Sequence, residues 1–87
     1  MAQDNTTLLL YGTEACHLCE LAEALLVRVT SASTMEWHWQ KVDISETDAL
    51  FDRYGWVIPV VAAPDGSELH WPFDQPALEA FILSHQP

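Results

Sequence analysis

The apolar residues in the first third of the chain change their spacing at one point. Residues 7–11 form a short apolar run that ends at Gly12, which is typical of a buried strand. Beyond this point, apolar residues recur at intervals of three and four, at Leu18, Leu21, Ala22, Leu25, Leu26 and Val29. This spacing predicts an amphipathic helix that buries one continuous face.

The middle of the chain is typical of a second strand and a short helix. Residues 37–44 form the strand, and Ser45 with Asp48 three residues later resembles a capping box that starts the helix. Gly55 suits the C-terminal cap of this helix. The inner face of the helix is expected to consist of Leu50, Phe51 and Tyr54.

The last third of the chain predicts a hairpin and a final helix. Residues 57–63 and 67–71 form the two strands, because the Pro-Asp-Gly sequence between them is typical of a turn. Asp74 or Gln75 is positioned to cap the helix that follows. The residues expected to face the core from this helix are Leu78, Phe81 and Ile82.

These elements predict a single α/β domain over residues 1–87, with a polar tail at 1–6. Their order is β-α-β-α-β-β-α, and the first two strands are expected to be parallel because a right-handed helical crossover joins them. The hairpin then adds two antiparallel strands, so the expected sheet order is 2-1-3-4. Helices on both faces of the sheet would complete a three-layer structure.

Charge and cysteine content exclude several classes of protein. The formal net charge is −10, with three basic residues against thirteen acidic ones, so we expect no binding to nucleic acid or to anionic membranes. Residues 1–6 are not expected to form a signal peptide, because they have no basic start and no apolar run. The longest apolar run, 57–63, is too short to span a bilayer. Two cysteines form at most one disulfide within the chain, too few to stabilise a small secreted protein of the disulfide-rich class. We therefore expect a cytoplasmic monomer.

The chemistry of the chain is concentrated in the sequence Cys16-His17-Leu18-Cys19, which lies between the first strand and the first helix. A helix N-terminus presents unpaired N–H groups and partial positive charge, which lower the pKa of a cysteine placed there. The spacing brings the second sulfur within disulfide reach. Cys16 is thus expected to attack a disulfide and Cys19, the more buried sulfur, to resolve the mixed disulfide.

Two other functions remain open for the cysteine pair. The chain is a non-catalytic binding module in one alternative, and in the other its thiolates carry zinc or an iron–sulfur cluster. Zinc requires four ligands, whereas His38, His70 and His85 are scattered without ligand spacing. His17, between the sulfurs, either stabilises a thiolate as imidazolium or is simply an exposed side chain.

Three segments resemble glutaredoxin-like proteins of the thioredoxin superfamily. Residues 11–19 (YGTEACHLC) are similar to the active-site segment, 42–44 (VDI) to the end of the second strand, and 54–61 (YGWVIPVV) to the segment with the cis-proline. The likeness extends over residues 8–83. It implies a thioredoxin fold and a thiol–disulfide oxidoreductase with no cofactor besides the redox-active Cys16–Cys19 pair.

The same resemblance assigns further site residues. It makes Cys16 the nucleophile and Cys19 the resolving cysteine. Pro59 would be cis, and the backbone of Ile58 would hold an extended substrate, which is a protein or a small molecule with a disulfide or a thiol. Independently of the resemblance, His17 is a third residue expected to contact substrate, because it lies between the two sulfurs.

Two departures from the glutathione-dependent members bear on the electron donor. Glu14 stands where those proteins usually carry a basic residue, and residues 71–74 (WPFD) lack their glycine pair. Among the basic residues, only Arg53 is expected to approach the Pro59 edge. The sequence therefore predicts a dithiol reductant such as a thioredoxin in preference to glutathione.

Overall fold

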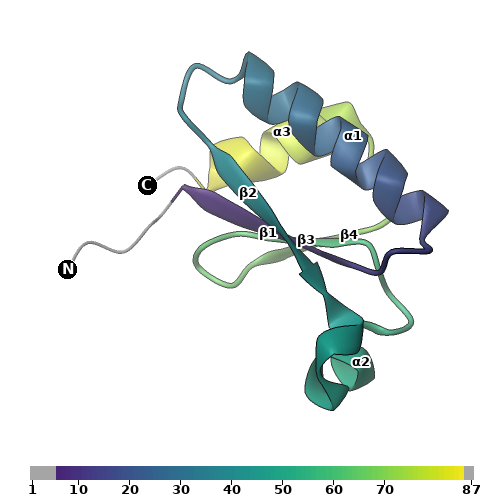
Figure 1. The fold of residues 1–87 in the computed structure, drawn as a ribbon. Coiled ribbons are helices and arrows are strands. Elements are labelled where there is room, and N and C mark those ends of the chain that lie inside the picture. The colour runs from purple at the N-terminus through teal and green to yellow at the C-terminus, as the bar shows by residue number, and fades with distance from the viewer. Residues whose placement is uncertain (1–5, 86–87) are drawn as a thin grey trace.

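The computed structural model describes residues 6–85 (Figure 1). All but the last residue of the expected tail 1–6 therefore lies outside the described part. In chain order the elements are β1 (Thr7–Gly12), α1 (His17–Ala32), β2 (His38–Asp43), the 3₁₀ helix η1 (Ile44–Glu46), α2 (Asp48–Tyr54), β3 (Val60–Ala62), β4 (Glu68–His70) and α3 (Gln75–Ser84). Within residues 6–85, no helix has the length and apolar character needed to cross a membrane.

The four strands form one mixed sheet with the order β2-β1-β3-β4, which confirms the prediction. β1 pairs in parallel with β2, with Leu10 opposite Lys41, and antiparallel with β3, with Tyr11 opposite Val60. β4 continues the sheet antiparallel to β3. Figure 1 shows α1 and α3 on one face of the sheet and α2 beyond the end of β2.

The core has one part on each face of the sheet, because side chains alternate along β1. Leu8 and Leu10 are buried on the face that α1 and α3 cover, and Tyr11 belongs to the other face. The larger cluster also contains Ala22, Leu26, Val29, Trp37, Val61, Phe73, Leu78 and Ile82. The smaller cluster, under α2, is formed by Ile44, Tyr54 and Val60. Two packed faces make the three-layer α/β arrangement that the sequence predicts.

The buried face of α1 is rotated relative to the predicted one. Leu18 and Leu21, expected to face the core, are each 43% exposed. The buried residues of α1 are Cys19, Ala22, Leu26 and Val29. The spacing alone allows both rotations, since Ala22, Leu26 and Val29 belong to either stripe. Cys19 decides between them, because its side chain packs against the strand end at Gly12.

The predicted start of α2 is wrong in its details. Ser45 caps no helix; its own N–H is bound at 2.9 Å by the Asp43 carboxylate, which caps η1. Thr47 caps α2 instead, because its hydroxyl accepts the N–H of Leu50 at 3.1 Å. Phe51 was expected to face inward and is 54% exposed, since a helix of two turns buries only its Tyr54 side fully.

The hairpin strands are shorter than predicted. β3 begins at Val60 rather than at residue 57, because Val57 lies in the turn after α2 and its N–H bonds to the Tyr54 carbonyl at 3.0 Å. Pro59 has no N–H to give to a ladder. The prediction for α3 is confirmed: the Asp74 carboxylate caps it by accepting the N–H of Ala77 at 2.9 Å.

A stacked and hydrogen-bonded group fastens α2 to the sheet. The rings of Tyr54 and Tyr11 stack with centroids 4.2 Å apart, and the Tyr54 hydroxyl donates to Glu68 of β4. The pKa of Glu68 is lowered, chiefly by this hydrogen bond and to a smaller extent by His70 and Arg53. Burial, and then the bond to Glu68, raise the pKa of Tyr54 far above its ordinary value. At neutral pH the donor is thus protonated and the acceptor charged, so the connection persists.

Candidate functional site

The two cysteines meet where β1 gives way to α1. They form a disulfide whose Cα atoms are 5.2 Å apart. Cys16 is the N-cap residue of α1, with extended backbone, and its Sγ accepts the N–H of Cys19 at 3.1 Å. Cys16 is half-buried and Cys19 is buried, which confirms the prediction that Cys19 is the more buried sulfur.

The N-cap position gives Cys16 the surroundings of a nucleophile. The first amides of α1 have no partner within the helix, and a negative charge placed among them is stabilised. A sulfur that already accepts one of these amides favours the thiolate once the disulfide is reduced. The arrangement therefore pairs an accessible sulfur that can attack with a buried one three residues later.

Gly12, at the end of β1, leaves the space that the buried sulfur occupies. A Cβ atom at this position would lie 2.9 Å from the Cys19 Sγ and 3.2 Å from its Cβ. Any larger residue would therefore displace the buried sulfur. The signal in the sequence is a glycine between a buried strand and the CxxC motif, which marks a close approach as well as a turn.

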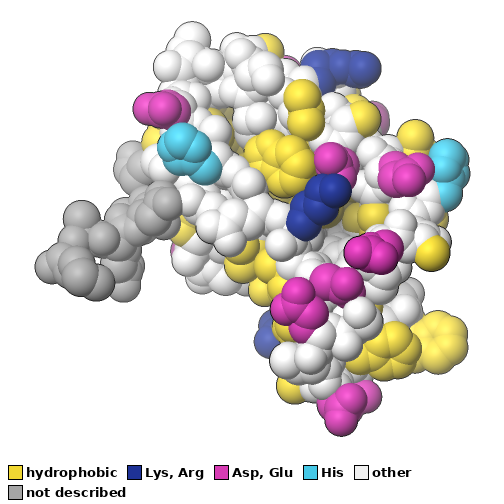
Figure 2. All heavy atoms as spheres, viewed as in Figure 1, with side chains coloured by type: hydrophobic (Ala, Val, Ile, Leu, Met, Phe, Trp, Pro, Cys, Tyr) yellow, Lys and Arg dark blue, Asp and Glu magenta, His cyan; other side chains and the backbone are white. Residues whose placement is uncertain are grey.

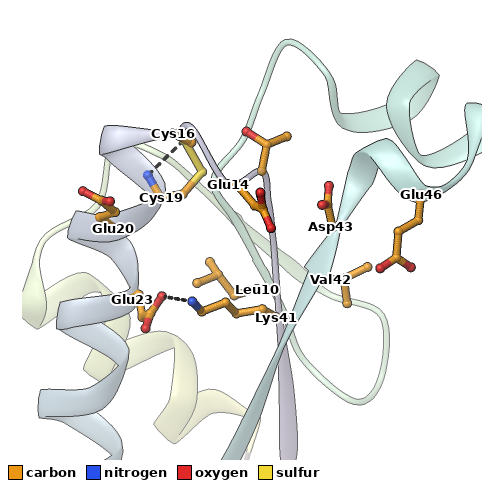
Figure 3. Close-up of a pocket in the computed structure, with 12 residues that line it drawn as sticks. Leu10, Glu14, Cys16, Cys19, Glu20, Glu23, Lys41, Val42, Asp43 and Glu46 are labelled. Atoms are coloured by element: carbon orange, nitrogen blue, oxygen red, sulfur yellow. Dashed lines mark hydrogen bonds and ion pairs between the residues drawn. A yellow bond between two sulfur atoms is a disulfide. The ribbon is translucent and has the colours of Figure 1, made fainter.

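A cavity of about 430 Å³ opens beside the disulfide (Figure 3). It lies between α1, the ends of β1 and β2, and η1. Its lining consists of Leu10, Gly12, Thr13, Glu14, Cys16, Cys19, Glu20, Glu23, Lys41, Val42, Asp43 and Glu46. A space of this size beside both sulfurs is large enough to admit part of a substrate.

The charges around this cavity are mostly negative. The five carboxylates that line it are Glu14, Glu20, Glu23, Asp43 and Glu46. The pKa of Asp43 is lowered by hydrogen bonds from the Ser45 side chain and then its backbone, so this carboxylate stays charged in weak acid. Lys41 is the one basic residue in the lining, and its Nζ lies 2.7 Å from Glu23 Oε1, the contact drawn in Figure 3.

One basic residue reaches the cavity that the sequence did not assign to the site. Arg53 was the only basic residue expected to approach the Pro59 edge, and its guanidinium lies 3.7 Å from the Glu68 carboxylate of β4. Lys41 lines the cavity beside the disulfide, because the parallel register of β1 and β2 places it opposite Leu10, two residues before Gly12. The sequence shows Lys41 on a strand but not the register of that strand.

The other expected site residues lie outside the cavity lining. His17 is exposed, with Nδ1 3.7 Å from the Glu20 carboxylate. The Ile58–Pro59 peptide bond is cis; Pro59 is buried, and Ile58 packs against the cluster under α2. β3 begins at Val60 and runs antiparallel to β1, which ends at Gly12. Ile58 and Pro59 therefore lie at the same end of these strands as the start of the loop to Cys16.

Metal ligation was one of the open alternatives. In the described stretch 6–85, histidine, cysteine and acidic side chains form no group of three or more that could hold a metal ion.

Comparisons with known proteins agree with this geometry. The family model described as glutaredoxin-like domain (DUF836) matches residues 7–83. The X-ray structure of target protein XcR50 from X. campestris is 38% identical, covers 92% of this chain and 99% of its own, and has a TM-score of 0.76. The solution structure of Ne2328 from Nitrosomonas europaea is 26% identical, with coverage of 93% and 95% and a TM-score of 0.73. No curated protein matches the chain.

One further similarity concerns the fold alone. A mutant thioredoxin from Halobacterium salinarum is 24% identical, with coverage of 97% of this chain and 77% of its own and a TM-score of 0.71. The sheet order, the placement of the cysteines after β1 and the family match over residues 7–83 thus agree. The chain belongs to the glutaredoxin-like domain family and has the thioredoxin fold.

Proposed function

We propose that the protein is a thiol–disulfide oxidoreductase in which Cys16 is the nucleophile and Cys19 the resolving cysteine. The observation that carries the proposal is the N-cap position of Cys16, whose Sγ accepts the Cys19 N–H at 3.1 Å beside a buried second sulfur. Family membership and the cavity beside the disulfide support it.

The chemistry is two successive thiol–disulfide exchanges. In the reduced protein the Cys16 thiolate attacks a substrate disulfide, forms a mixed disulfide and releases one substrate sulfur as a thiolate, which takes a proton from solvent. The Cys19 thiolate then attacks Cys16 Sγ, releases the second substrate thiolate and leaves the Cys16–Cys19 disulfide. Two electrons pass to the substrate, and an external dithiol restores the protein by the reverse sequence.

Three further residues are proposed to form the substrate site: His17 and the backbone of Ile58 by contact, and the buried Pro59 by holding that backbone in place. The exposed imidazole of His17 lies next to the nucleophile in the chain. The backbone of Ile58 and Pro59 lies at the same end of the sheet as the loop to Cys16. An extended substrate held at this edge would lie across the accessible sulfur. The substrates are proteins or small molecules with a disulfide, and we place the protein in the cytoplasm, where thiols are kept reduced.

Alkylation of the reduced protein tests the assignment of roles. Cys16 is expected to react with iodoacetamide about tenfold faster than Cys19 at neutral pH, because it is more exposed and accepts a helix amide. Peptide mapping after short labelling times measures both rates, and labelling of the unfolded protein provides the reference. Faster labelling of Cys19 would reverse the roles, and equal rates would contradict the assignment. Stoichiometric zinc or iron in the purified protein would favour the carrier alternative.

The charges of the cavity predict which reductant works. Glutathione carries two carboxylates and one ammonium group, whereas the cavity has five carboxylates and one lysine already paired with Glu23. Like charge within a Debye length of about 8 Å weakens both encounter and docking. We therefore expect poor turnover with glutathione and faster reduction by a dithiol donor such as a thioredoxin.

The comparison requires both donors at matched potential and at two salt concentrations. A glutathione rate that rises with salt concentration would identify charge repulsion as the cause of the poor turnover. Efficient glutathione turnover that salt leaves unchanged would contradict the prediction.

A further inference from the structure

An exposed apolar surface lies at the end of α2, in the segment that leads to Pro59. We call Phe51, Trp56 and Val57 the aromatic patch; their exposed fractions are 54%, 96% and 38%. Figure 2 shows apolar side chains gathered over α2, at the lower right of the molecule. The other three tryptophans are buried or half-buried. A tryptophan left almost wholly in water makes no contribution to the core, and such residues are enriched at interaction sites.

The patch belongs to a segment that leaves the sheet at the same end as the loop to the disulfide. Tyr11 pairs with Val60, so the chain before Val60 and the chain after Tyr11 leave the sheet on the same side. The first of these segments carries Trp56 and the second carries Cys16. The α2 helix also contacts η1, which supplies Glu46 to the cavity beside the disulfide. A molecule bound to Cys16 that extends toward α2 therefore reaches the patch.

Charges around the patch indicate the character of its occupant. Asp48 and Asp52 are exposed on α2, and Glu46 is exposed on η1. Figure 2 shows acidic side chains beside the apolar ones in this region. Arg53, the basic residue of α2, lies against Glu68. The surroundings of the patch are thus negative, and they complement a positively charged partner.

We propose that the aromatic patch docks protein substrates whose disulfide is flanked by apolar and basic residues. This inference rests on the proposed oxidoreductase function and names its substrate class. Trp56 is the apolar anchor of the complex, and the acidic side chains around it speed the encounter and select the partner. Protein–protein interfaces concentrate their binding energy in a few central residues, often aromatic, that polar contacts surround.

Synthetic peptides supply the test. Three peptides share one intramolecular disulfide: the first is flanked by lysine and leucine, the second by glutamate and leucine, and the third by lysine and glycine. The reduced protein is expected to reduce the lysine–leucine peptide about tenfold faster than either of the others, measured as kcat/KM. The advantage over the glutamate peptide is expected to shrink as the salt concentration rises.

Two variants identify the patch as the cause. Trp56→Ala is expected to lose about tenfold in kcat/KM for the lysine–leucine peptide. The loss with bis(2-hydroxyethyl) disulfide is expected to be smaller, because this disulfide has no flanking residue to occupy the patch. Leu83→Ala, which removes an exposed apolar side chain from α3, is the matched control and is expected to change neither rate. Because Trp56 is almost fully exposed, its removal leaves the core intact.

A charge variant tests the second half of the inference. Neutralising Glu46 and Asp52 together as Glu46→Gln/Asp52→Asn is expected to reduce the preference for lysine over glutamate. Glu36→Gln/Glu79→Gln, with the same change of net charge elsewhere on the surface, is expected to retain that preference.

The outcomes separate this inference from the proposed function. If Trp56→Ala reduces the lysine–leucine peptide as fast as the unaltered protein, or if the glutamate peptide is reduced equally well, the docking surface is wrong although the oxidoreductase stands. If the unaltered protein reduces neither the peptides nor the small disulfide, the proposed function itself fails.

Discussion

Replacing Cys16 with serine is expected to lower disulfide reductase activity about a thousandfold or more, because the sulfur that starts the exchange is lost. The remaining Cys19 is buried and packed against Gly12, so it cannot take over the attack on a substrate disulfide. Cys19→Ser keeps the attacking sulfur and loses the resolving one. Without a thiol donor it is expected to react once per molecule and then stop, because only an external thiol can release the bound substrate sulfur.

The measurement is steady-state reduction of bis(2-hydroxyethyl) disulfide coupled to a dithiol donor. Thermal melts of the reduced proteins serve as the control for folding, since both substitutions exchange sulfur for a hydroxyl of similar shape. A Cys16→Ser variant with a tenth or more of the original rate would place the nucleophile elsewhere.

Truncation of Leu26 to alanine is expected to lower the free energy of unfolding by about 2–5 kcal/mol. Leu26 is fully buried between α1 and the sheet, in the cluster that also holds Leu10 and Leu78. A loss of this size is a large fraction of the whole stability of a small domain, about 5–15 kcal/mol. Leu21→Ala on the same helix is expected to cost less than about 1 kcal/mol, because Leu21 is 43% exposed.

Urea unfolding of the two variants, both with the disulfide intact, compares them directly. The pair also tests the rotation of α1, which brings Cys19 to the inner face of the helix. Equal losses of stability at Leu21 and Leu26 would contradict that rotation and, with it, the burial of the resolving cysteine.

The order of the elements and the arrangement of the sheet could be predicted from the sequence, and the rotation of one helix could not. The period of hydrophobic residues changes clearly at Gly12, and the Pro64-Asp65-Gly66 turn marks the hairpin. The α1 pattern, however, contains two overlapping apolar stripes. Only the contact between Cys19 and Gly12 decides between them, and that contact joins two elements.

In the candidate site, too, the sequence predicted the residues with a local signal and missed those whose place depends on contacts between elements. The sequence indicated Cys16 and Cys19 because local chemistry, a cysteine pair at a helix start, carries that signal. It missed Lys41, whose place in the cavity depends on the register between β1 and β2. It also misplaced the cap of α2, since Ser45, Thr47 and Asp43 are all good capping residues and the 3₁₀ turn η1 selects among them.

The central claim is that a substrate sulfur becomes bonded to Cys16 and that Cys19 then releases it. Intact-mass analysis of reduced Cys19→Ser protein after brief exposure to bis(2-hydroxyethyl) disulfide tests this directly. The account predicts one stoichiometric 2-hydroxyethylthio adduct, mapped to Cys16 and removed by dithiothreitol, whereas the unaltered protein under the same conditions holds only its internal disulfide. An unmodified Cys16 in that variant, or an equal adduct on Cys19 in Cys16→Ser, would contradict it.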